Sequence, residues 1–291
     1  MAQLSRANLL HPVPRRPMTE VPVPGLIFPE GPRWRDGWWW LSDQNTDRVF
    51  SIDEQGVVEV VCEVEAPSGL GFLPDASLLV VSMRDPSLVR FDGSTVKEHA
   101  DLRPFARHVN DMFVAGDGRA YVGAFDDPYD PATNRLLLVD PDGAAVVAAE
   151  HLACPNGITA TIDGHTLLVA ETFGGQISAF DIGGDGTLGD RSVWARLPDG
   201  GKPDGLCLDA AGDVWVASFE NGEFLHLRAG GEVLERITFT GRWAMAPCLG
   251  GRDGRSLLFC TSETSFADRA AGRGVGHIDI QRVDVPGVQL P

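Results

Sequence analysis

A carboxylate or amide side chain stands between a proline and a glycine in the motifs PEG at Glu30, PNG at Asn156 and PDG at Asp204. Carboxylate and amide oxygens are hard ligands that suit Ca²⁺, Mg²⁺ or Mn²⁺, with water completing the coordination shell. Zn²⁺ is a weaker candidate, because the motifs contain no histidine or cysteine. Each motif alone is also an ordinary turn sequence, since Asn and Asp hydrogen-bond their own backbone. Together the motifs predict a site for one divalent cation, with calcium preferred.

The three motifs hold equivalent positions in an internal repeat. Each copy has two short apolar strands around a glycine-containing turn and then a third strand, with room for a fourth. A four-stranded repeat with a period of about 40 to 50 residues is typical of a β-propeller, whereas a β-sandwich shows no sixfold period. The six copies begin at Glu30, Ser68, Asn110, Asn156, Asp204 and Ala246.

We therefore predict an all-β fold, a six-bladed β-propeller with four-stranded antiparallel blades around a central channel. Residues 19–291 are expected to form this single domain, after an N-terminal tail of residues 1–18. The chain ends should share a blade, because an unclosed ring would leave an open sheet edge. Residues 20–25 are expected to supply the outer strand of the last blade, and residues 263–276 a loop on one face of it. Because the innermost strand of each blade lines the channel, the first residues of the repeats should converge at one mouth.

The composition limits the classes of partner. Apolar residues make up 43% of the chain, which is enough for a large core and excludes disorder as the dominant state. The net charge of −17 disfavours binding to nucleic acids and to anionic membranes. Five widely spaced cysteines without a CxxC pair fit a reducing compartment, and no signal peptide or long apolar run is evident. We expect a cytoplasmic protein with a small-molecule substrate, and the sequence leaves its oligomeric state open.

Several of these motifs resemble one known family. PEGPRW at Glu30, ND at Asn110, PNGI at Asn156 and KPDGLCLDAAGDVWVA at Lys202 are similar to the SMP-30/gluconolactonase/LRE family over roughly residues 20–290. The resemblance implies a six-bladed propeller with one divalent cation in the channel and, in many members, hydrolysis of lactones. It implies metal ligands at Glu30, Asn156 and Asp204, the same residues that the repeat selects, and a substrate contact at Asn110.

One position departs from the family pattern. Sugar lactonases of the family commonly carry an arginine two residues before the asparagine that corresponds to Asn110, and this chain has His108 there. Arg107 is adjacent, but neighbouring residues of a strand face opposite ways. Since that arginine helps to hold sugar hydroxyls, the departure favours a smaller or more apolar lactone, or a different ester-like substrate.

The resemblance predicts a metal-dependent lactonase. In the expected mechanism the cation polarises the lactone carbonyl and a water attacks it, with Asp204 as both ligand and general base. His108 is an alternative base or a substrate donor, because imidazole titrates near neutral pH. Arg107 is a further candidate for a substrate contact. Two alternatives stay open: another metal-assisted reaction in the same pocket, such as phosphotriester hydrolysis or a biosynthetic ring opening or isomerisation, and a non-catalytic propeller that binds a ligand or partner around a structural metal.

Two further signals have less weight. Glu171 and Glu263 end strands of the innermost type and are weak candidates for a channel mouth. The GDGTLG segment at residues 184–189 matches a dinucleotide-binding pattern, but no helix is expected after it, so a hairpin loop is the better interpretation.

Overall fold

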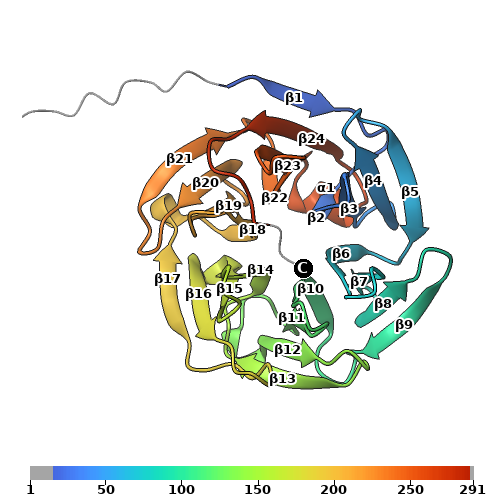
Figure 1. Cartoon of the computed structure of the whole chain (residues 1–291), viewed down its shortest axis with the longest axis vertical. Helices are drawn as coiled ribbons and strands as arrows, with labels where there is room; N and C mark the ends of the chain where they lie inside the picture. Colours follow the sequence, from blue (N-terminus) through green and yellow to red (C-terminus); the bar gives the residue numbers. More distant parts are fainter. Residues whose placement is uncertain (1–15, 289–291) are drawn as a thin grey trace, which may run out of the picture.

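The computed structural model describes residues 16–288, and these form six four-stranded antiparallel sheets around one axis (Figure 1). The predicted six-bladed β-propeller is therefore confirmed. Residues 1–15 of the predicted tail and residues 289–291 lie outside the described residues.

Within blades 1 to 5 the strands run outward from the axis in chain order, and each sheet is a meander of hairpins. Blade 1 comprises β2 (Pro29–Arg35), β3 (Trp38–Asp43), β4 (Arg48–Asp53) and β5 (Val58–Glu63), and blade 2 comprises β6 (Pro67–Phe72), β7 (Leu78–Ser82), β8 (Ser87–Phe91) and β9 (Val96–Asp101). Blade 3 comprises β10 (His108–Val114), β11 (Ala120–Phe125), β12 (Arg135–Val139) and β13 (Ala145–Glu150). Blade 4 comprises β14 (Pro155–Ala160), β15 (Thr166–Glu171), β16 (Gln176–Asp181) and β17 (Ser192–Arg196), and blade 5 comprises β18 (Pro203–Leu208), β19 (Val214–Ser218), β20 (Glu223–Leu227) and β21 (Val233–Thr238).

Blade 6 is built from both ends of the chain. It comprises β22 (Trp243–Gly250), β23 (Ser256–Glu263) and β24 (Val275–Arg282), with β1 (Met18–Val21) as its outer strand. β1 pairs antiparallel with β24, so the N-terminal segment closes the ring as expected, although its strand begins and ends earlier than residues 20–25. His277 on β24 also contacts Glu20 on β1, with 2.9 Å between Nδ1 and Oε1.

The core is divided among the gaps between blades. Six clusters of buried apolar side chains each fill the space between two neighbouring blades. The tryptophan run of β3 shows how one strand serves two of these gaps. Trp39 packs on Trp34 in the cluster shared with blade 6, while Trp40 packs edge-on against Phe72 of blade 2. Alternate side chains of a strand face opposite sides of the sheet, so each blade is apolar on both faces.

Two backbone features shape the channel mouth. Every innermost strand has a register shift near its start, as between Glu30 and Arg33 of β2 or between Pro203 and Leu206 of β18. β-Bulges of this kind redirect side chains relative to the sheet. The glycine after the blade-start residue then allows neighbouring strands to touch. A Cβ on Gly157 would lie 2.5 Å from the backbone oxygen of Asp204 in the next blade.

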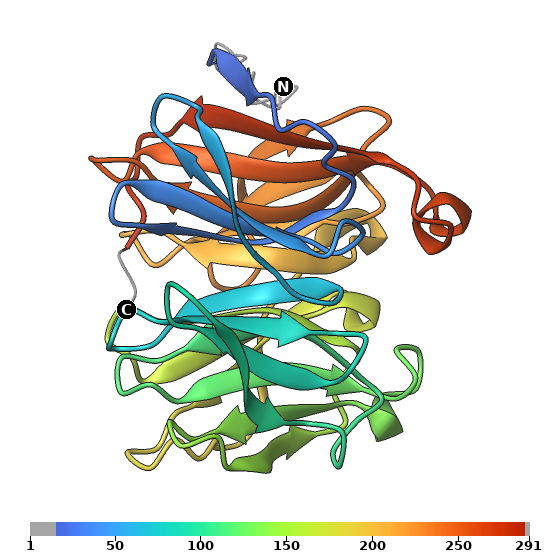
Figure 2. The ribbon, with the colours of Figure 1, turned by 90° about the vertical axis from the view of Figure 1, so that its right-hand side faces the viewer.

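The two faces of the ring carry different segments. The loop between β23 and β24, expected at residues 263–276, projects from one face and contains the short helix α1 (Phe266–Ala270), whereas the C-terminal segment lies on the opposite face (Figure 2). Three 3₁₀ turns complete the secondary structure of the described residues: η1 (Pro131–Thr133), η2 (Thr172–Gly174) and η3 (Pro198–Gly200). Among residues 16–288, no helix has the length and apolar character needed to span a bilayer.

Candidate functional site

The blade-start residues meet at the channel mouth on the face that carries α1. Glu30, Asn156 and Asp204 each occupy the second position of an innermost strand, on β2, β14 and β18. Glu30 and Asp204 are 7% and 3% exposed, and Asn156 is half-buried. The negative charge of Asp204 acts on Glu30, so strands far apart in sequence bring two carboxyl groups into one electrostatic environment.

Burial and mutual repulsion perturb both acids. Burial raises the pKa of Glu30 well above its ordinary value, and the charges of Asp204 and Asp111 raise it further. The pKa of Asp204 rises to about 8, chiefly through burial and then through the charge of Asp111. Strongly raised carboxyl pKa values are characteristic of functional sites, because a folded chain rarely concentrates unpaired acids without a use for them.

An unsatisfied oxygen marks the same place. Asp204 Oδ1 is buried and has no hydrogen-bond partner among the described residues. Buried carboxylate oxygens are normally paired, since an unpartnered one loses its hydration without compensation. Two carboxylates and an amide oxygen form the donor set that hard divalent cations prefer. The residues present therefore fit a divalent cation, which would supply the missing partner.

Hydrogen bonds orient the two asparagines of the mouth. Asn156 Nδ2 donates to Thr172 Oγ1 at 3.2 Å, and Thr172 Oγ1 donates to the backbone oxygen of Pro203 at 2.8 Å. Thr172 therefore links Asn156 to Pro203, the residue before Asp204. Because the amide nitrogen of Asn156 faces Thr172, its amide oxygen faces away from Thr172. In the same way Ser68 Oγ donates to Asn110 Oδ1 at 3.2 Å, which leaves the amide N–H groups of Asn110 for another partner.

Other predicted residues lie outside this group. His108 is exposed at the rim, where its ring packs on Phe125 at 5.4 Å between centroids. Arg107 is exposed as well, and its backbone N–H donates to Asp126. Glu171 is buried but fully engaged, since it accepts from the backbone N–H of Ala153 at 2.7 Å and from the side chains of Ser178 and Gln176.

Glu263, the other weak candidate, is the last residue of β23, the second strand of blade 6 counted from the channel. It is exposed and pairs with Arg242 and His277, at 3.6 and 3.2 Å. The structure therefore does not bring Glu263 to the channel mouth.

The sequence interpretation did not include two charged neighbours of the candidate site, Asp111 and Arg269. Asp111 occupies the place where blades 1, 2, 4 and 5 have glycine, and its carboxylate lies 3.4 Å from the guanidinium of Arg33 on blade 1. An aspartate in this glycine position of the repeat is visible in the sequence and could have identified Asp111 as a candidate site residue. Arg269 on α1 had no such signal. Its charge acts on both Glu30 and Asp204, although the helix belongs to a loop of blade 6.

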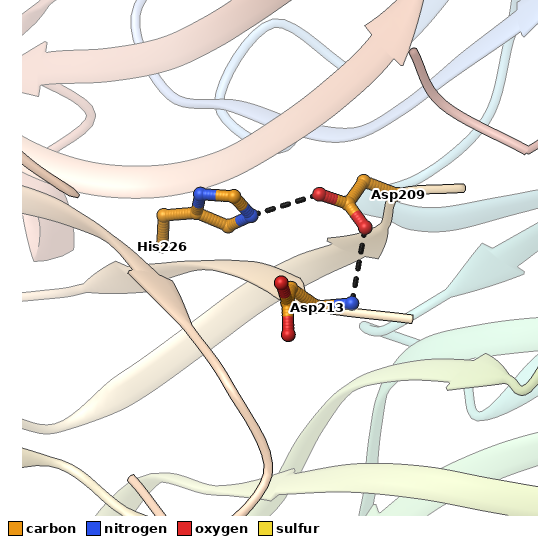
Figure 3. A group of neighbouring side chains, drawn as sticks. All are labelled: Asp209, Asp213 and His226. Carbon is orange, nitrogen blue, oxygen red and sulfur yellow. Dashed lines mark hydrogen bonds and ion pairs between the residues drawn. The ribbon is translucent and has the colours of Figure 1, made fainter. Parts of the chain in front are cut away.

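A second acidic cluster lies within blade 5. Asp209, Asp213 and His226 bring one ligand atom each to within 4.8 Å of one another (Figure 3). Asp209 already accepts from the backbone N–H groups of Ala211 and Asp213, and its other oxygen lies 2.9 Å from His226 Nε2. The His226 ring stacks on Trp215 at 4.6 Å. Because both Asp209 oxygens have protein partners, the cluster serves to hold the β18–β19 turn, and the Glu30 mouth fits a cation better.

A cavity lies at the far mouth of the channel. Its volume is about 600 Å³, and it is lined by the other ends of the innermost strands, including Trp34, Phe113 and Cys207, and by Val288 of the C-terminal segment. It contains none of the blade-start residues, so it is separate from the Glu30 mouth.

Known proteins resemble this chain over most of its length. Residues 28–263 match the SMP-30/Gluconolactonase/LRE-like region, and the chain belongs to that family. It is 32% identical over 274 residues to 6-deoxy-6-sulfogluconolactonase of Pseudomonas putida, which covers 91% of this chain and 94% of the relative. It is 28% identical to pentonolactonase XacC of Haloferax volcanii, over 84% of each chain. The solved structure of regucalcin from Agrobacterium tumefaciens, described as a calcium-binding protein, shares the fold with a TM-score of 0.78 at 20% identity, over 91% of this chain and 93% of that one.

Proposed function

We propose that this protein is a divalent-metal-dependent lactone hydrolase, with Glu30, Asn156 and Asp204 as the metal ligands. One observation carries the proposal. Asp204 Oδ1 is buried without a hydrogen-bond partner in the described part of the chain, and the charge of Asp204 acts on Glu30. Two relatives that match most of the chain are named as lactonases, which supports the reaction class. Both names refer to sugar lactones, so sugar lactones are the first substrates to test despite His108.

A bound cation would supply polarisation of the lactone carbonyl and stabilisation of the oxyanion that forms on it. Asn156 would offer its amide oxygen as a ligand, because its N–H group is held by Thr172. Asn110 would donate its free N–H groups to substrate oxygens, since its own oxygen accepts from Ser68. Calcium is the preferred metal for an all-oxygen donor set, and magnesium and manganese are the alternatives.

Asp204 is proposed to act as general base as well as ligand. It would take the proton from the attacking water while the water oxygen bonds to the carbonyl carbon. The ring C–O bond then breaks, and the proton passes to the leaving alkoxide, so that lactone and water give the hydroxy acid. Glu30 would bind the cation through its carboxylate, and the positive charge of the cation would keep that carboxylate ionised although burial raises its pKa.

The test is lactone hydrolysis followed by proton release over a panel of sugar and aliphatic lactones. Each assay is run with Ca²⁺ or Mn²⁺, after chelation, and with Asp204→Asn. We expect turnover that disappears on chelation and falls by at least 1,000-fold in Asp204→Asn, as for loss of a group that acts on the reacting water. His226→Gln is the control, because it removes the imidazole of the blade 5 cluster and leaves the Glu30 mouth intact. Metal binding without turnover of any lactone would instead favour a binding role.

A further inference from the structure

Helix α1 lies on an aromatic floor at the Glu30 mouth. Phe266 and Arg269 are three residues apart and share one face of the helix. Phe266 packs on Trp243, with 4.8 Å between ring centroids, and Trp243 packs on Phe28 at 6.5 Å. The Arg269 guanidinium lies over the Phe28 ring at 4.3 Å from its centroid. Phe28 is two residues before Glu30, so the contact with Phe28 places the guanidinium of α1 near the edge of the candidate site.

Blade 1 fixes this guanidinium from the other side. Arg269 Nη2 donates to Gln44 Oε1 at 2.5 Å, and the backbone oxygen of Arg269 accepts from Asn45 Nδ2 at 3.2 Å. Gln44 in turn donates to Ser68, which holds Asn110. A chain of hydrogen bonds therefore connects Arg269 on α1 with Asn110, the proposed substrate contact.

Within residues 16–288, Arg269 forms no ion pair with a carboxylate, because no carboxylate oxygen lies within salt-bridge distance of its guanidinium. The charges that act on it belong to Glu30 and Asp204, which a divalent cation would neutralise. The neighbouring acids are already engaged: Asp111 pairs with Arg33, and Asp43 accepts from the backbone N–H groups of Ile27, Phe28 and Asn45.

A half-buried guanidinium with only a neutral partner is unfavourable unless a ligand supplies negative charge. The planar guanidinium binds carboxylate, sulfonate or phosphate oxygens through two parallel N–H donors. The structure leaves part of the surface exposed on each of Asn110, Asn156 and Arg269, which are half-buried.

We propose that Arg269 determines substrate specificity by binding an anionic substituent, so that the substrate is a lactone carrying a carboxylate, sulfonate or phosphate group. This inference rests on the proposed lactonase function and names its substrate class. Arg269 then provides, from a different blade, the cationic contact that His108 does not provide in the position where family members commonly have arginine.

The test compares matched neutral and anionic lactones. Wild-type protein, Arg269→Gln and Arg269→Lys, each loaded with Mn²⁺, are assayed with glucono-lactone, with glucaro-lactone, which has a free carboxylate, and with 6-phosphoglucono-lactone. We expect Arg269→Gln to lower kcat/KM about 10- to 100-fold for the anionic lactones, the range for loss of one charged hydrogen bond, and less than threefold for the neutral one. Arg269→Lys should restore part of the loss, and the two anions show which group is preferred. Equal losses on all three substrates would overturn the proposal.

Binding without turnover separates this proposal from the proposed function. Calorimetric titration of the Mn²⁺-loaded proteins with glucuronate and with glucose should show a preference for glucuronate that Arg269→Gln abolishes. Lys202→Gln is the control, because Lys202 lies at the same mouth but already pairs with Glu220 at 2.7 Å; it should keep the preference. Lactone turnover without a preference for anionic ligands would refute the role of Arg269 but not the lactonase activity. Charge preference without turnover would refute lactonase activity while the anion site stands.

Discussion

Replacing Thr172 with valine isolates the support of one proposed metal ligand. The side chain is 5% exposed, and valine has nearly the same shape, so the change removes the hydroxyl without opening a cavity. Two hydrogen bonds are lost, from Asn156 Nδ2 at 3.2 Å and to the oxygen of Pro203 at 2.8 Å. The amide of Asn156 is then free to rotate, and its oxygen no longer faces the cation in every molecule.

Loss of such a support typically weakens metal affinity 10- to 100-fold. That range corresponds to about 1.4 to 2.7 kcal/mol of binding free energy. The unsatisfied groups left behind should also lower the free energy of unfolding of the metal-free protein by about 1 to 3 kcal/mol. Titration calorimetry of Mn²⁺ into chelator-treated protein measures the first effect, and a melting curve without metal measures the second.

A control substitution at another buried threonine tests whether the loss of metal affinity is specific to Thr172. Thr261 on β23 is fully buried, and its Oγ1 has no hydrogen-bond partner among the described residues. Thr261→Val should therefore keep wild-type metal affinity and equal or higher stability. Thr172→Ser, which retains a hydroxyl, should recover most of the affinity. A dissociation constant for Mn²⁺ in Thr172→Val within twofold of wild type, or the same loss in Thr261→Val, would refute the reasoning.

Two other predictions concern the carboxyl pair and the strand contact beside it. In the folded protein the pKa of Asp204 is raised to about 8 and that of Glu30 is also raised, so their contribution to stability is complete below about pH 4 and is lost as the pH rises through about 8. Because a cation replaces those protons, the increase in Tm on adding Mn²⁺ should grow from pH 5 to pH 8, and an increase that stays constant over this range would contradict the coupling. Gly205→Ala would place a Cβ 2.3 Å from that of Ala246, which should cost about 1 to 3 kcal/mol and lower Tm by several degrees. An unchanged melting curve would show that the innermost strands can separate without loss.

The blades and the order of strands followed from local patterns in the chain. Turn residues, alternating apolar positions and a regular spacing recur in each copy, and such signals act over a few residues. The motifs at Glu30, Asn156 and Asp204 could be singled out as candidates from their places in the repeat, because equivalent positions in a closed ring must meet at its axis. Their role as metal ligands stays a prediction. The N-terminal outer strand was expected from the need for closure, but its bounds were not.

The contacts between blades were decided only by the tertiary structure. Thr172 reaches Asn156 and Pro203 because the 3₁₀ turn η2 of blade 4 begins beside β18, and nothing in the sequence around Thr172 indicates that contact. Arg269 lies beside Gln44, 225 residues earlier, because ring closure places blade 6 next to blade 1. The sequence by itself determined the repeat and the residues at its start, since these depend on local periodicity. Which side chains surround them, and with what charge, depends on how α1 and the neighbouring blades pack, and long-range packing has no local pattern from which it can be read.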